Sequence, residues 1–138
     1  MNVIIVGAGN LGSSLARKLS DLGHRITVIE KNPKAVSLLP CGRVDSGEMT
    51  VIHRDGSTGP AMIEAGIANA DIFIAATGKD SLNGLAAQRA KIIFRVDQVM
   101  TAVKDDGVRT LYDSLGITTL NKAALASDHL VAMLDEGV

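Results

Sequence analysis

Three glycines near the amino terminus, Gly7, Gly9 and Gly12, have the spacing of a phosphate-binding turn between a short apolar run and a helical stripe. In such a turn the first glycine permits a tight bend, the second lets a diphosphate approach the backbone, and the third lets the helix pack closely on the strand. Free amides at the helix start favour a phosphate there. A tight turn with nothing bound is the alternative. We predict phosphate contacts from the residues of this turn: Gly7, Gly9, Asn10, Leu11 and Gly12.

An acidic residue, Glu30, ends the second apolar run. It follows the glycines at about the distance, roughly 20 residues, at which a carboxylate hydrogen-bonds the ribose hydroxyls of an adenosine. A carboxylate there repels a 2′-phosphate, which favours NAD or an adenine nucleotide over NADP. The adjacent Lys31 weakens this preference, because its ammonium group can neutralise such a phosphate; a solvated lysine is the other interpretation.

Two further clusters of polar and small residues follow later runs. Asp55, followed by Gly56, is placed to accept from an adenine amino group, or else to form an Asx turn or helix cap. Thr77 is placed to meet phosphate or ribose, and Asn83 to tie its loop to the first turn, although ordinary helix capping explains both equally well. These clusters add six predicted site residues: Asp55, Gly56, Ala76, Thr77, Gly78 and Asn83.

Catalytic and metal-binding residues are not expected. His24, His53 and His129 have no visible carboxylate or cysteine partner, which favours solvated or structural roles. Cys41 is the single cysteine, so no internal disulfide forms and a reducing compartment is expected. A small NAD-dependent oxidoreductase remains an alternative, as does a structural oligomerisation module with a vestigial site.

The elements that position these residues alternate between β-branched runs and stretches of helical period, which is typical of βαβ units. We predict an α/β fold: a Rossmann-type, doubly wound, parallel six-stranded sheet in three αβα layers, forming one domain over residues 1–138. The predicted strands cover residues 3–6, 25–30, 49–53, 71–76, 98–103 and 117–120. The predicted helices cover residues 11–22, a start at 33, 57–66, 81–94 with Ser81 as cap, 108–115, and an amphipathic stretch over 123–134 within the C-terminal segment 122–138. Residues 40–47 are predicted to be a loop.

Composition narrows the class of partner. The 138 residues are 46% hydrophobic, 21% charged and only 2% aromatic, with a formal net charge of -1. The near-neutral charge and the few aromatic residues give no reason to bind nucleic acid or an anionic membrane surface. No apolar run approaches the ~18 residues that span a bilayer, and no leader segment is expected at the amino terminus.

Taken together, these blocks resemble the nucleotide-binding domain of the regulator-of-potassium-conductance family, also called the TrkA N-terminal domain. The likeness covers residues 1 to about 121. It is carried by residues 4–12, 23–24, 28–33, 65–71, 76–78, Asp80, Asn83 and 115–117. Arg54 replaces a glycine that is usual in the family, and Ala102 aligns where an arginine is common.

The resemblance implies a cytoplasmic regulatory subunit that binds NAD(H), or alternatively ATP or ADP, and gates a membrane potassium transporter or channel. It also implies a homodimer or larger ring, with residues 122–138 as a crossover-type helix. Any attachment to the inner face of the membrane is then through a partner rather than by insertion.

Overall fold

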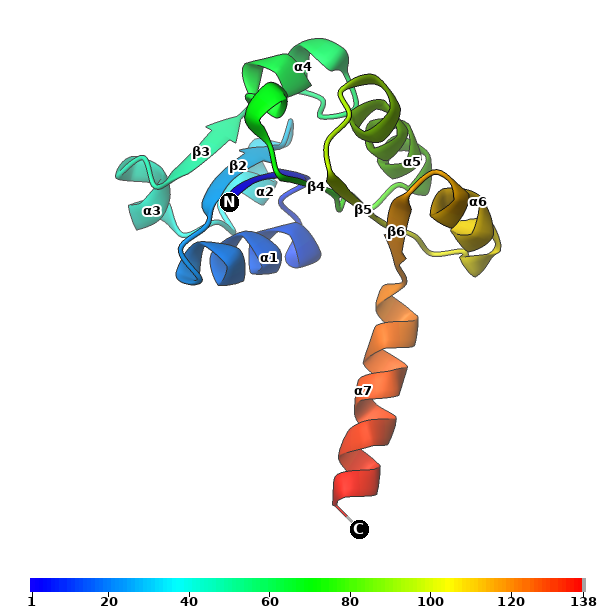
Figure 1. Ribbon diagram of the computed structural model, residues 1–138. Coiled ribbons are helices and arrows are strands. Elements are labelled where there is room, and N and C mark those ends of the chain that lie inside the picture. Colours follow the sequence, from blue (N-terminus) through cyan, green and yellow to red (C-terminus); the bar gives the residue numbers. More distant parts are fainter. Residues whose placement is uncertain (138) are drawn as a thin grey trace.

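A parallel sheet of six strands forms the centre of the computed structural model, which describes residues 1–137 (Figure 1). The strands are β1 (Asn2–Val6), β2 (Arg25–Ile29), β3 (Met49–Ile52), β4 (Ile72–Ala75), β5 (Gln98–Ala102) and β6 (Ile117–Leu120). Their order across the sheet is β3-β2-β1-β4-β5-β6, and all neighbours run parallel. This confirms the predicted doubly wound sheet. The order reverses between β1 and β4, so a crevice opens at the carboxyl ends of these two strands.

Helices cover both faces of the sheet and complete the predicted three layers. One face carries α1 (Asn10–Asp21), α2 (Pro33–Val36) and α3 (Cys41–Asp45). The other face carries α4 (Gly59–Glu64), α5 (Asp80–Gln88) and α6 (Arg109–Ser114). Short helical turns join them: η1 (Ile67–Asn69), the π-helical η2 (Arg89–Ile93) and η3 (Asp106–Val108).

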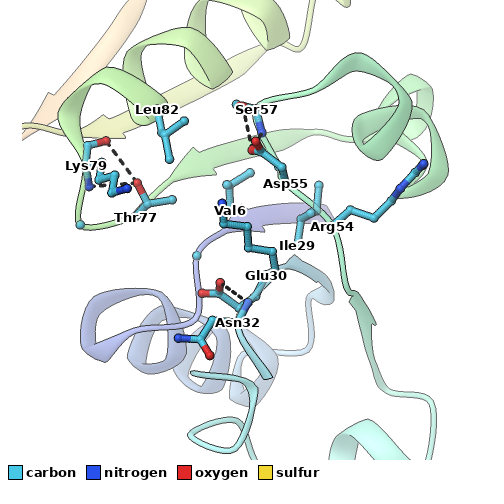
Figure 2. Close-up of a pocket in the computed structure, with 14 residues that line it drawn as sticks. Val6, Ile29, Glu30, Asn32, Arg54, Asp55, Ser57, Thr77, Lys79 and Leu82 are labelled. Carbon is cyan, nitrogen blue, oxygen red and sulfur yellow. Dashed lines mark hydrogen bonds between the residues drawn. The ribbon is translucent and has the colours of Figure 1, made fainter. Parts of the chain in front are cut away.

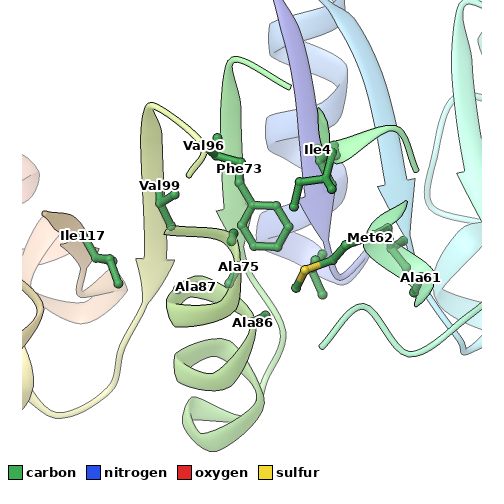
Figure 3. Close-up of a cluster of buried hydrophobic side chains, with 14 of the residues drawn as sticks. Ile4, Ala61, Met62, Phe73, Ala75, Ala86, Ala87, Val96, Val99 and Ile117 are labelled. Carbon is green, nitrogen blue, oxygen red and sulfur yellow. The ribbon is translucent and has the colours of Figure 1, made fainter. Parts of the chain in front are cut away.

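Each face of the sheet has its own apolar core. On the α4–α6 side Phe73 is fully buried, with Ile4, Met62 and Val99 around it (Figure 3). The α1–α3 side is built from aliphatic residues such as Ile5 and Val28. Burial on both faces explains why the central strands read as continuously apolar rather than alternating.

The prediction of a loop over residues 40–47 is wrong, because α3 lies there. Pro40 precedes this short helix without a side-chain cap, and Gly47, with φ +84°, follows it in the left-handed conformation. Val44 packs against the core of the α1–α3 face. This long-range contact of a partly buried side chain is not visible in the glycines and polar residues that favour a turn here.

The prediction that Ser81 caps the fifth long helix is also wrong. Helix α5 begins at Asp80, so Ser81 lies inside its first turn, and no side chain caps the helix from the preceding Lys79. Past Gln88 the helix widens into the π-helical η2, which ends close to the predicted residue 94. The other predicted boundaries agree with the structure to within about two residues.

The last helix, α7 (Lys122–Glu136), projects away from the sheet (Figure 1). Every one of its residues is exposed, including Leu130 at 60% and Leu134 at 68%. Over the described residues no strand or helix packs along it. Its apolar side therefore has no partner among residues 1–137, and the last residue of the predicted segment, Val138, lies outside the described residues.

Candidate nucleotide-binding site

A cavity of about 420 Å³ lies at the carboxyl ends of β1, β2, β3 and β4 (Figure 2). Because the ends of β1 and β2 and of β1 and β4 are in register, at Val6–Ile29 and Val6–Ala75, the turns that follow these strands converge. Seven of the predicted site residues line this cavity: Gly7, Glu30, Lys31, Asp55, Gly56, Thr77 and Gly78. Six do not line it: Gly9, Asn10, Leu11, Gly12, Ala76 and Asn83.

The three glycines of the first turn meet different surroundings. Gly7 has φ +103°, and a Cβ there would lie 2.8 Å from the Ala76 carbonyl oxygen. A Cβ on Gly12 would collide with the carbonyl oxygen of Gly7. A Cβ on Gly9 would meet nothing within 4 Å. The fold itself therefore requires Gly7 and Gly12, whereas the space beside Gly9 is open to a ligand.

The start of α1 presents backbone donors at this open space. Gly9 precedes the helix and provides no side-chain cap. Among the described residues, the amides of Asn10, Leu11 and Gly12 have no hydrogen-bond acceptor. Unsatisfied amides at a helix start attract anions, and the helix dipole adds to the attraction. The turn thus has the donors and the room that a diphosphate needs.

Glu30 links the first turn to the end of β2. Its Oε1 accepts from the Ala8 amide at 2.8 Å. Its Oε2 accepts from the Asn32 amide at 3.0 Å, a hydrogen bond drawn in Figure 2. One amide of the glycine-rich turn is therefore already bonded within the protein. Each carboxylate oxygen has a second lone pair, so Glu30 can hold the turn and still accept from a ligand hydroxyl in the cavity that it lines.

Asp55 forms the Asx turn that the sequence offers as one interpretation. Its Oδ1 accepts from the Ser57 amide at 3.0 Å and from the Ser57 hydroxyl at 2.7 Å. The backbone hydrogen bond, followed by the hydroxyl, lowers the pKa of Asp55; Lys31 lowers it further and burial opposes the shift. Gly56 comes next, and a Cβ there would collide with the side chain of Val6. This contact explains the glycine, because the loop packs directly on β1.

Asn83 holds the loop after β4 by hydrogen bonds to Thr77. Its Oδ1 accepts from the Thr77 amide at 2.9 Å and from the Thr77 hydroxyl at 2.6 Å. Its Nδ2 donates to the carbonyls of Thr77 and Ala102, at 3.0 and 3.2 Å. Asn83 is 1% exposed. Its hydrogen bonds within the described residues join this loop to the end of β5 and not, as predicted, to the first turn.

Seven cavity residues were not predicted as site residues: Val6, Ile29, Asn32, Arg54, Ser57, Lys79 and Leu82. Val6 and Ile29 end strands whose carboxyl ends define the crevice, a signal that could have identified them. Leu82 comes from the first turn of α5, and no local pattern indicates that it faces the cavity. The guanidinium of Arg54 points away from the cavity and donates to Glu64 at 3.1 Å (Figure 2).

A second cavity of about 290 Å³ lies on the other side of the loop after β4. It shares Thr77 and Gly78 with the first cavity and reaches the beginning of α7 at Lys122. The peptide segment of Thr77 and Gly78 is thus a common wall between the two.

Within residues 1–137, histidine, cysteine and acidic side chains form no group able to hold a metal ion. The helices of the described chain include none whose length and hydropathy would let it cross a membrane.

A family model describing the TrkA-N domain matches residues 3–122. The chain belongs to the TrkA-N family. The Trk system potassium uptake protein TrkA of Streptomyces coelicolor is 33% identical to this TrkA-N chain over 135 residues, which are 97% of the chain and 58% of that protein. The chain spans about half the length of the curated relatives it matches.

Solved structures show the same fold. The C-terminal domain of a Shewanella denitrificans Kef protein in an AMP-bound form has a TM-score of 0.73 at 17% identity, covering 100% of this chain and 83% of that chain. The GsuK channel bound to NAD has a TM-score of 0.67 at 17% identity, covering 86% of this chain and 21% of that chain. The predicted family and fold are therefore confirmed.

Proposed function

We propose that this TrkA-N chain is a nucleotide-sensing regulatory domain of a potassium transport system, with NAD(H) as its ligand and ATP or ADP as the alternative. The observation that carries the proposal is the open space beside Gly9, next to the three free amides of Asn10, Leu11 and Gly12. Both suit a diphosphate.

The remaining predicted residues take roles around this anchor. The adenosine extends from the first turn into the 420 Å³ cavity, where Glu30 accepts from its ribose hydroxyls. Gly7, Ala76 and Gly78 provide backbone at the crevice, and Thr77 stands at its edge. Asn83 acts indirectly, by fixing Thr77.

The adenine end lies between the ends of β2 and β3. Ile29 provides an apolar surface there, Gly56 brings the loop close to β1, and Asp55 keeps an Oδ2 that no protein group occupies within the described residues. Lys31 lines the same region, and its charge compensates part of the negative charge of the two carboxylates, Glu30 and Asp55. A lysine at this position favours an anionic ligand over a neutral nucleoside.

The carboxylate of Glu30 suits two free ribose hydroxyls, which favours NAD(H), ATP or ADP over NADP. The GsuK channel bound to NAD and the Kef domain bound to AMP support binding of an adenine nucleotide by this fold, as a dinucleotide or as a mononucleotide. A role in potassium transport follows from the Trk system relatives. The membrane partner is then a potassium transporter or channel subunit, and the domain works at the inner face of the membrane through that partner.

Self-association is part of the proposal. The exposed apolar residues of α7 repeat at helical spacing, as Ala126, Leu130 and Met133. A second copy of the chain can cover this side, so that α7 acts as a crossover-type helix in a homodimer or larger ring.

Isothermal titration of the purified chain with NAD, NADH, ATP and ADP tests the function. We expect a dissociation constant in the micromolar range for at least one of them, about 8 kcal/mol of binding free energy at 1 μM. Absence of heat and of any thermal shift at millimolar concentrations of all four would contradict the proposal. Turnover of NAD with a panel of alcohols, acids and aldehydes would instead support the oxidoreductase alternative.

A further inference from the structure

Lys104 connects its own loop to two segments that are distant in the sequence, residues 78–80 and Asn121. It follows β5, and its amide donates to Asp80 Oδ2 at 2.8 Å, which fixes it to the first turn of α5. Its Nζ donates to the carbonyl oxygen of Gly78 at 2.9 Å, which fixes it to the loop after β4. Its own carbonyl oxygen accepts from Asn121 Nδ2 at 3.4 Å. Its amide, its carbonyl and its ammonium group thus each contact a neighbouring loop.

Asn121 is the residue from which α7 starts. Its Oδ1 accepts from the Ala124 amide at 3.0 Å and caps the helix. Its Nδ2 donates to Asp106 Oδ1 at 3.1 Å as well as to Lys104. Because every residue of α7 is exposed, the direction of the helix is set at this first turn and by the end of β6, where the Leu120 carbonyl accepts from the Val103 amide at 2.8 Å.

The Gly78 carbonyl that holds Lys104 belongs to the wall shared by the two cavities. A ligand in the first cavity contacts this wall from one side, while Lys104 holds it from the other. A ligand that contacts Thr77 and Gly78 therefore acts on the carbonyl that Lys104 holds. Any shift of Lys104 acts in turn on Asn121.

We propose that Lys104 is a positioning residue that transmits nucleotide occupancy to α7 through Asn121. This inference rests on the proposed nucleotide binding. The two states are a nucleotide-free form with Lys104 on Gly78, and a bound form in which the Lys104–Asn121 contact and the direction of α7 have changed. Nucleotide favours the second state only through its higher affinity for that state.

Amide hydrogen exchange of the full chain tests the relay, with peptides covering residues 118–126 measured with and without saturating NAD. In the wild type we expect the exchange rate there to change at least about twofold, the size expected for coupling of 0.5–2 kcal/mol. Lys104→Met is expected to abolish this change at matched NAD occupancy. Asn121→Ser keeps a capping oxygen for α7 but lacks the amide donor to Lys104, and it should abolish the change as well.

Lys91→Met is the matched control. Lys91 also donates through Nζ to a carbonyl, that of Asp97 at 2.7 Å, but at the amino end of β5, away from the crevice. The response of α7 to NAD should survive in this variant. A merely structural lysine would change stability without removing the response to ligand.

The outcomes separate the two proposals. A response of α7 that persists in Lys104→Met or in Asn121→Ser overturns the relay, and so does NAD binding to the wild type with no change at α7. In both cases nucleotide binding stands. Failure of the wild type to bind any of the four nucleotides overturns the proposed function, and the relay with it.

Discussion

Replacing Gly9 by alanine separates ligand binding from folding. A Cβ at this position meets nothing within 4 Å, and the backbone has φ -69°, which an L-residue adopts without strain. A compatible Gly→Ala change stabilises a protein by about 0.4–1 kcal/mol through the unfolded chain. Alanine is a poorer residue than glycine in front of a helix, by up to about 1 kcal/mol. The two effects offset, so the free energy of unfolding should change by less than about 0.5 kcal/mol.

The same methyl group occupies the place where a diphosphate would approach the amides of Asn10 and Leu11. Loss of one hydrogen bond to a charged group costs about 1.5–3 kcal/mol. We therefore expect the dissociation constant for NAD to rise by about 10- to 150-fold. Titration calorimetry measures this change, and urea unfolding of the same preparation measures stability.

Gly12→Ala is the matched control, because it should lower the stability of the fold. Its methyl group would collide with the Gly7 carbonyl oxygen, which is backbone and cannot rotate away. Forcing extra atoms into a packed site costs about 1–3 kcal/mol of stability. If Gly9→Ala binds NAD as tightly as the wild type, or unfolds as easily as Gly12→Ala, the assignment of Gly9 to the ligand is refuted.

Three further predictions concern Glu30, Asp55 and α7. Glu30→Ala removes the acceptor of the Ala8 and Asn32 amides, so it should weaken NAD binding and cost about 1 kcal/mol of stability; unchanged affinity by calorimetry would remove Glu30 from the site. The lowered pKa of Asp55 means that its charged form stabilises the fold above the unfolded pKa of about 4, and that this contribution is lost as the pH falls through the lower, folded pKa. The wild type should therefore exceed Asp55→Asn in stability at neutral pH and approach it in acid, and a gap independent of pH in unfolding curves would contradict this. Leu130→Asp should convert a dimer to a monomer in size-exclusion chromatography with light scattering, and a monomeric wild type would end the crossover-helix proposal.

The fold could be predicted because its signals are local. Apolar runs bounded by glycine and polar residues indicate strands, and the alternation with helical stretches indicates a parallel sheet. The exceptions share one feature, which is a contact with a residue distant in the sequence. Val44 of α3 packs against the core of one face of the sheet, and Asp80 at the start of α5 accepts from the Lys104 amide. Neither partner can be recognised from the neighbouring sequence.

The site residues also divide into those that can be predicted from the local sequence and those whose position depends on tertiary structure. Gly7, Glu30 and Thr77 follow strands, and any parallel sheet brings the carboxyl ends of adjacent strands together. Lys79 and Leu82 line the cavity because α5 begins at its edge. Asn83 donates to the carbonyl of Ala102, 19 residues further along the chain at the end of β5. The role of Asn83 therefore depends on β5 lying beside β4 in the sheet.

The glycines show which part of this pattern concerns a ligand at all. Gly7, Gly12 and Gly56 are each explained by a contact inside the protein, with Ala76, Gly7 and Val6 respectively. Their presence would be required in a domain of this shape that bound nothing. Gly9 has no such contact, and it stands where helix α1 leaves its first amides without acceptors. The motif as a whole therefore argues for the fold, whereas the argument for a bound diphosphate rests on Gly9 and those amides.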